Sequence, residues 1–150
     1  MRFTFTGDQE VFRQEVCNFL TQELTPEIVA KNRDLKEYGG YNYEFAREFA
    51  RKLGARGYIG MGWPKEYGGG GRDAIYSVIL AEEMEYHHAP STHRFGPMLA
   101  PSILAFGTEE QKKFFIPKIR NGEIVLFLGY SEPEAGSDLA NLQTRAVADG

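Results

Sequence analysis

Helical periodicity constrains the fold of this chain most strongly, because it extends over roughly the first 120 residues and then stops at Asn121–Gly122. Apolar residues recur three and four positions apart in segments that begin near residues 7, 42, 73, 95 and 108. Thr6 with Gln9, and Thr108 with Gln111, are capping boxes, in which side chains satisfy the free backbone groups of a first helical turn. The pattern therefore predicts a bundle of amphipathic helices.

The apolar positions of these segments are the expected core. They are Phe12, Val16, Phe19 and Leu20 in the first segment, Phe45, Phe49 and Leu53 in the second, Ile75, Val78 and Ile79 in the third, and Phe114, Phe115 and Ile119 in the last. The segment from Phe95 to Phe106 contains Pro97 and Pro101, which predicts a broken helix that is buried on most sides. Residues 32–41 and 58–71 are polar or rich in Gly and Pro, and are expected to be loops.

After Gly122 the pattern becomes that of β structure. Ile124–Leu128 is a β-branched and aromatic run between turn residues, which predicts a buried strand. Gln143–Gly150 predicts a second strand that ends in an Asp-Gly hairpin turn. Since an isolated hairpin is marginally stable in water, these strands are expected to begin a larger β domain. The predicted fold class is mainly α, with a helical bundle over residues 1–122 and the first strands of a β domain over residues 123–150.

Charge and composition exclude several functional classes. The chain has a formal net charge of −4 at pH 7 and 42% hydrophobic residues, so it is a globular chain with no general attraction for nucleic acid or anionic membranes. No apolar stretch reaches the roughly 18 residues that a membrane-spanning helix needs, and the N-terminal residues lack the apolar core of a signal peptide. The single cysteine, Cys17, cannot form an internal disulfide and is expected to be a buried structural thiol. These features predict a soluble cytoplasmic protein.

Several residues of catalytic or metal-binding type have structural explanations. His87, His88 and His93 suggest a metal site, but adjacent histidines cannot both face inward and no Cys or carboxylate triad completes the site, so no metal is expected. Gly68–Gly71 lacks the Lys-Ser/Thr pair of a phosphate-binding loop and is interpreted as a turning connector. The acids of Glu132–Asp138 have the composition of a glycosidase pair but are expected to be solvated.

One segment has the composition of a ligand-binding loop. Leu128–Asp138 follows the end of the first predicted strand and contains two serines, two glycines and three acidic residues. Hydroxyls and free backbone amides at a strand end can bind the polar edge of a planar ring and a nearby phosphate. The residue types alone predict a ligand loop and no particular ligand.

Gly129–Asp138 resembles the first signature of the acyl-CoA dehydrogenase family. Trp63–Gly69 is similar to a loop between helices of that family's N-terminal domain. Gly107–Lys113, followed by Pro117–Ile119 and Gly122–Glu123, is similar to the helix before its flavin domain. These motifs occur in the family's order and extend over nearly the whole chain. The resemblance implies an all-helical N-terminal domain followed by the start of a β-barrel-like domain that binds FAD.

The resemblance also implies roles for residues of the loop. It places Leu128 and Tyr130, through their backbones and with Gly129 between them, against the polar edge of the flavin. Ser131 contacts the same edge through its hydroxyl and amide, and Ser137 corresponds to a serine near the FAD diphosphate and the acyl-CoA. The implied reaction removes a proton α to the thioester and transfers a hydride from the β carbon to FAD. The implied partners are an acyl-CoA thioester, an electron-transfer flavoprotein and further subunits of a homo- or hetero-oligomer.

Two positions depart from the family pattern. Tyr130 stands where an aliphatic residue is usual, and Asn141 where a small residue is usual, so Tyr130 is expected to affect substrate choice. The second flavin-contacting segment and the catalytic Glu are expected beyond Gly150, so none of residues 1–150 is expected to be the general base. This 150-residue piece alone is therefore expected to be inactive. An alternative hypothesis is a non-catalytic helical subunit or interaction module that completes a site with a partner chain.

Overall fold

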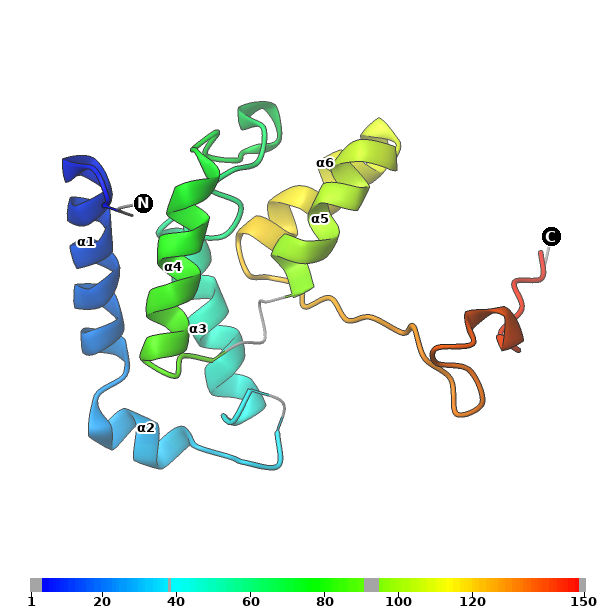
Figure 1. The fold of residues 1–150 in the computed structure, drawn as a ribbon, viewed down its shortest axis with the longest axis horizontal. Coiled ribbons are helices and arrows are strands. Elements are labelled where there is room, and N and C mark those ends of the chain that lie inside the picture. Colours follow the sequence, from blue (N-terminus) through cyan, green and yellow to red (C-terminus); the bar gives the residue numbers. More distant parts are fainter. Residues whose placement is uncertain (1–3, 38, 91–94, 149–150) are drawn as a thin grey trace.

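The helices form where the capping and apolar patterns predict them. A computed structural model describes residues 4–37, 39–90 and 95–148, and over these residues the chain forms six α-helices and two short 3-10 helices (Figure 1). They are α1 (Gly7–Glu23), α2 (Pro26–Asn32), α3 (Tyr43–Ala55), η1 (Lys65–Tyr67), α4 (Ala74–Tyr86), α5 (Phe95–Phe106), α6 (Glu109–Arg120) and η2 (Leu139–Asn141). None of the helices in these ranges is long and apolar enough to cross a membrane.

Side-chain caps fix where the longer helices begin. The Thr6 hydroxyl accepts a hydrogen bond from the Gln9 N–H at 3.4 Å, and the Gln9 side chain accepts one from the Thr6 N–H at 2.9 Å. Thr108 and Gln111 form the same capping box at the start of α6, and the Asn42 side chain caps α3. These starts confirm the boundaries that the sequence predicts.

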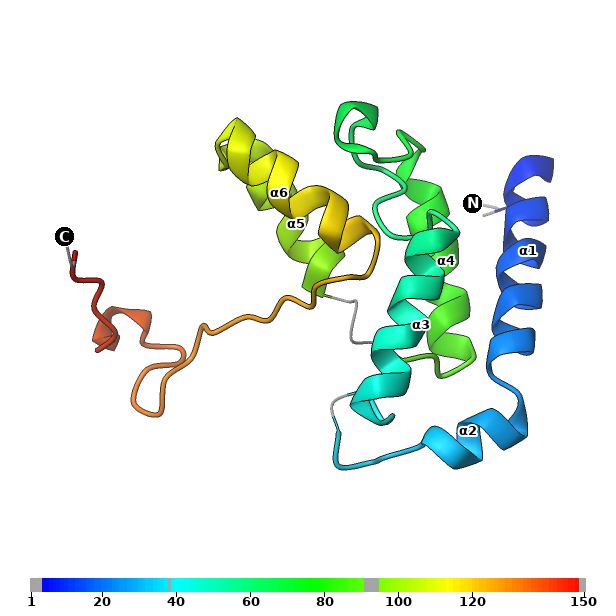
Figure 2. The same ribbon diagram turned by 180° about the vertical axis from the view of Figure 1, so that it is seen from behind.

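The helices pack around one core. Helix α1 lies along α4 and α5 packs on α6 (Figures 1 and 2). The short helix η1 contacts α6. The buried apolar residues form a continuous cluster that consists of Phe12, Val16, Phe19, Leu20, Phe49, Leu53, Tyr58, Ile59, Met61, Trp63, Ile79, Leu80, Met84, Ala100, Ile116 and Ile119. The four positions predicted on α1 are confirmed, since each is at most 3% exposed. Val78 and Phe114 are instead 54% exposed, because the buried faces of α4 and α6 pass through other residues.

Two glycines allow α3 and the end of α6 to approach closely. A Cβ atom on Gly54, which lies inside α3, would meet the backbone of Arg120 and Asn121 at the end of α6. Gly122 has a positive φ of 66° and packs directly on the backbone of Ala50 in α3. Helix α3 continues past Gly54 and ends in a left-handed turn at Gly57.

Helix α5 differs from the broken, buried helix that its two prolines predict. It is continuous from Phe95 to Phe106. Pro97 is its third residue, where a backbone N–H has no acceptor within the helix, so only Pro101 removes a hydrogen bond from the interior. The expected burial on most sides is also wrong, because Met98 is 52% and Phe106 is 90% exposed.

The two predicted strands do not form within the described residues. Residues 124–128 are extended but make no ladder, and the chain after α6 runs away from the helices (Figure 2). Ile124 and Leu126 pack against the bundle, whereas Phe127 is 83% exposed. A strand needs a neighbouring backbone to accept and donate its hydrogen bonds, and no described segment lies alongside to supply one. The Asp149–Gly150 turn lies outside the described residues.

Candidate functional site

The loop with the family signature closes on itself through a tight turn. The Glu132 N–H donates to the Ala135 carbonyl at 2.9 Å, and the Ala135 N–H donates back to the Glu132 carbonyl at 3.1 Å. Pro133 and Glu134 form the tip of this turn, and Ala135 is buried beneath it. The backbone of residues 132–135 is therefore held in one shape by its own hydrogen bonds.

The Glu132 carboxylate joins this turn to the chain that follows. Its oxygens accept hydrogen bonds from the Gln143 N–H at 2.8 Å, from the Thr144 N–H at 2.9 Å and from the Thr144 hydroxyl. The hydroxyl and these two amides hold the pKa of Glu132 below its ordinary value. The Asn141 side chain donates to the Glu134 carbonyl at 3.0 Å and adds a second connection. The expectation that Glu132 is merely solvated is wrong, because the sequence does not show that the chain returns to it.

The residues predicted to bind the cofactor lie on the outer side of this loop. Gly129, Tyr130, Ser131 and Ser137 are exposed, with Tyr130 at 70%, and Leu128 is half-buried. Within the described part of the chain, the backbone N–H groups of residues 128–131 donate to no protein acceptor. Hydroxyl and amide donors are thus available to an external acceptor, while the neighbouring turn is fixed.

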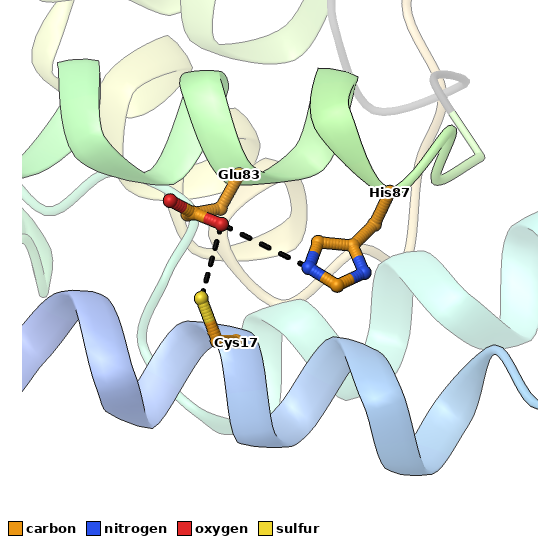
Figure 3. Close-up of side chains that lie close together, drawn as sticks. All are labelled: Cys17, Glu83 and His87. Carbon is orange, nitrogen blue, oxygen red and sulfur yellow. Dashed lines mark hydrogen bonds and ion pairs between the residues drawn. The ribbon is translucent and has the colours of Figure 1, made fainter.

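A second group of polar side chains lies between α1 and α4 (Figure 3). The Cys17 thiol donates to Glu83 Oε2 at 3.0 Å, and His87 Nε2 lies 3.8 Å from the same oxygen. Arg13 Nε donates to the other oxygen, Glu83 Oε1, at 2.5 Å. Glu83 is 5% exposed and is the buried charged residue of the described core. Each helix supplies two of these residues, spaced four apart on one face.

Burial and hydrogen bonding set the protonation of this group. Burial raises the pKa of the Cys17 thiol to about 11, and its hydrogen bond to Glu83 acts in the same direction. Burial alone would raise the pKa of Glu83, but the hydrogen bonds from Cys17 and Arg13 outweigh it and hold this pKa below its ordinary value. At neutral pH the group therefore contains a protonated thiol and an ionised carboxylate.

The structure changes the interpretation of the histidines. The expectation that no cysteine or carboxylate joins the histidines is wrong, because Cys17 and Glu83 both lie beside His87. The two adjacent histidines diverge as expected, since His88 is exposed and follows the end of α4 with a positive φ of 51°. His93 lies outside the described residues. The signal in the sequence was the pair of four-residue spacings, Arg13 to Cys17 and Glu83 to His87.

A cavity of about 430 Å³ lies between α4, residues 58–63 and the start of α5. Apolar side chains such as Met61, Trp63 and Met84 form much of its wall, and Arg72 and Glu85 contribute charged atoms. Its size falls within the range of about 300–1,000 Å³ that is usual for small-molecule sites. None of the predicted cofactor-binding residues lines it.

The helical bundle agrees with the sequence pattern described as "Acyl-CoA dehydrogenase, N-terminal domain", which matches residues 6–123. The chain belongs to the acyl-CoA dehydrogenase family. It is 42% identical over 151 residues to acyl-CoA dehydrogenase FadE26 of Mycobacterium tuberculosis, an alignment that covers 100% of this chain and 37% of that protein. The chain therefore spans just over a third of the length of the curated relatives it matches.

Solved structures of the family have the same fold. The ChsE4–ChsE5 complex from Mycobacterium tuberculosis matches with a TM-score of 0.84 and 40% identity over 100% of this chain and 37% of that one. The Tcur3481–Tcur3483 steroid acyl-CoA dehydrogenase matches with a TM-score of 0.83 and 36% identity, over 100% of this chain and 38% of that one. An acyl-CoA dehydrogenase from Bacillus anthracis, solved in complex with FAD, matches with a TM-score of 0.70 and 25% identity over 93% of this chain and 23% of that one.

Proposed function

We propose that the chain is the N-terminal part of a flavin-dependent acyl-CoA dehydrogenase that introduces a double bond between the α and β carbons of an acyl-CoA thioester. The supporting observation is the loop of residues 129–138, whose turn at residues 132–135 is held by its own hydrogen bonds and whose signature hydroxyls and amides are exposed, in a chain of this family. The residues on this loop fit a flavin because the N–H groups of residues 128–131 donate to no acceptor within the described residues.

In this proposal each exposed donor has one task. The amides around Leu128 and Tyr130 and the hydroxyl of Ser131 donate to the polar edge of the ring, and Ser137 donates toward phosphate or acyl-CoA oxygens. FAD, when bound, accepts the hydride that leaves the β carbon of the substrate. Fixed donors at the pyrimidine edge stabilise the negative charge that grows there on reduction, without having to reorient during the reaction.

The general base lies outside the chain in this proposal. Glu132 is occupied by three hydrogen-bond donors, and Glu83 is buried and paired with Arg13. Neither carboxylate is therefore free to remove the α proton. We also propose that electrons leave through an electron-transfer flavoprotein and that the protein works in the cytoplasm as part of an oligomer.

A second candidate function is a subunit that completes its site with a different partner chain. The observation in its favour is that a structure 40% identical to this chain was solved as a complex of two named proteins, ChsE4 and ChsE5. The similarity to a steroid acyl-CoA dehydrogenase makes a bulky, ring-containing acyl group the first substrate to test.

The experiment is to purify the full-length protein, alone and together with a candidate partner chain, and to record its visible spectrum before and after anaerobic addition of acyl-CoA thioesters. Straight-chain and steroid-derived thioesters form the panel. Flavin that bleaches in the protein alone supports a self-sufficient enzyme. Flavin and bleaching that require the partner support the two-chain form. Absence of flavin in both preparations would overturn the proposed function.

A further inference from the structure

We propose that Cys17, Glu83 and His87 form a binding site for a divalent transition-metal ion of the zinc class, between α1 and α4 (Figure 3). This site is separate from the loop of residues 129–138 and does not depend on the proposed function.

The backbone positions the three donors before any ion binds. Glu83 and His87 are four residues apart on α4, so they project from the same face of that helix. Helix α1 packs along this face and directs the Cys17 thiol toward them, as Figure 3 shows. Because two packed helices hold the donors, little conformational entropy is lost when they bind an ion together.

Two of the three donor–donor distances are within about 0.6 Å of those of a tetrahedral site. One donor atom from each residue lies within 4.8 Å of the other two, with 3.0 Å from Cys17 Sγ to Glu83 Oε2 and 3.8 Å from His87 Nε2 to that oxygen. Tetrahedral zinc with ordinary bond lengths separates such donors by about 3.3–3.6 Å. Shifts of a few tenths of an ångström in these two pairs, within the freedom of the side chains, bring them to that geometry.

The donor types select the ion. Thiolate, imidazole and carboxylate together suit zinc and its neighbours in the first transition series, whereas calcium and magnesium require oxygen donors. Three protein donors leave a fourth position for water. The site is half-buried, since the Cys17 and His87 side chains are partly exposed and give an ion a path from solvent.

Arg13 supports the carboxylate from the other side. It binds Oε1 of Glu83 and also lies 3.7 Å from Glu82, which leaves Oε2 directed at Cys17 and His87. Partners that bind the second atom of a metal ligand commonly fix its orientation. The Arg13 charge opposes a cation, but the Glu83 carboxylate, the Glu82 carboxylate and a Cys17 thiolate together outweigh it.

The binding step is a proton-for-metal exchange. In the metal-free group the Cys17 S–H bond points at Glu83, so its proton takes the place of the ion. On binding, the S–H bond breaks, the proton leaves to solvent, and bonds form from the metal to sulfur, to the carboxylate oxygen and to the imidazole nitrogen. No oxidation state changes.

The test uses the full-length protein, first freed of metal with a chelator and then titrated with Co(II), whose thiolate charge-transfer absorption reports cysteine ligation. We expect one equivalent to produce this absorption and Zn(II) to remove it by competition. The Cys17→Ser variant, which changes little volume, should lose the charge-transfer absorption. Glu83→Gln and His87→Gln should each weaken binding at least tenfold. His88→Gln, at the exposed neighbouring histidine, is the matched control and should bind as the wild type does.

Thermal unfolding distinguishes lost ligation from lost folding. Zn(II) should raise the Tm of the wild type and of His88→Gln, and should not raise that of Cys17→Ser through this site. The proposal is overturned if no thiolate absorption appears at stoichiometric Co(II), or if it persists in a folded Cys17→Ser protein. It is also overturned if His88→Gln weakens binding as much as His87→Gln.

Discussion

Substituting Gly54 with alanine tests the close contact between α3 and the end of α6. Helix propensity alone predicts that Gly54→Ala stabilises the protein by about 1 kcal/mol, because glycine is a poor residue inside a helix. The structure predicts the opposite sign. The new Cβ would lie 2.5 Å from the backbone carbon of Asn121 and 2.7 Å from the carbonyl oxygen of Arg120.

The size of the effect follows from these distances. Ordinary contact with a Cβ atom begins at 3.4 Å, so the backbone of Arg120 and Asn121 must move by several tenths of an ångström or more. This backbone ends α6 and enters the turn at Gly122, which itself packs on α3, so it cannot yield as a side chain would. Overpacking of this kind costs about 1–3 kcal/mol. Because backbone atoms must move, we expect a cost toward the upper end of this range, about 2–3 kcal/mol. The propensity gain of about 1 kcal/mol then leaves a net loss of about 1–2 kcal/mol, which lowers the Tm by about 2–8 °C.

The assay is thermal unfolding followed by circular dichroism, with Gly7→Ala as the matched control. Gly7 is also helical, and a Cβ there meets no atom within 4 Å, so the control should leave the Tm unchanged or raise it. A Tm of Gly54→Ala equal to or above that of the wild type would refute the close packing of α3 against α6.

Four further predictions address other parts of the molecule. Thr108→Ala removes the capping box of α6 and should lower stability by about 1 kcal/mol in urea unfolding, whereas Thr21→Ala, on the exposed side of α1, should have little effect. Tyr41 is buried and its hydroxyl donates to the His88 carbonyl at 2.9 Å, so Tyr41→Phe should cost about 1–2 kcal/mol by leaving that carbonyl unpaired. Burial raises the pKa of Tyr41, so the phenol ionises at lower pH in the unfolded chain than in the folded one, and stability falls as pH rises above about 10. Tyr41→Phe should make this fall in stability shallower. An unchanged pH dependence would contradict the burial of this phenol. Under the proposed function, Ser131→Ala in the full-length protein should make the flavin reduction potential more negative, because a donor to the reduced ring is lost; a potential equal to that of Thr21→Ala would count against the role of Ser131.

The sequence predicted the helices well because their signals are local. A capping box lies within four residues, and the spacing of Phe12, Val16, Phe19 and Leu20 identifies the buried face of α1 without reference to any other helix. The same reasoning failed where distant segments decide the outcome. Val78 is apolar but faces outward, and residues 124–128 have strand composition but no partner backbone among the described residues.

For the polar groups of the candidate sites, too, the sequence revealed what depends on neighbouring residues and missed what depends on distant ones. The serines of the loop were identified from a contiguous signature, and their contact with a flavin stays a prediction. Glu132 was misjudged because its donors, Gln143 and Thr144, lie on a segment whose return to the turn is set by tertiary structure. The group around Glu83 joins residues 66 and 70 positions apart, which no local pattern reveals.

A structure of the full-length protein with FAD bound would show directly whether the flavin contacts this loop, through the distances from the ring to the loop. We expect the Ser131 hydroxyl and a backbone amide of residues 128–131 to lie within about 3.2 Å of polar atoms of the flavin. The Glu132 contacts to residues 143 and 144 should persist in that complex. A flavin bound elsewhere, with the Ser131 hydroxyl and these amides bonded to the protein's own carbonyls, would contradict this expectation.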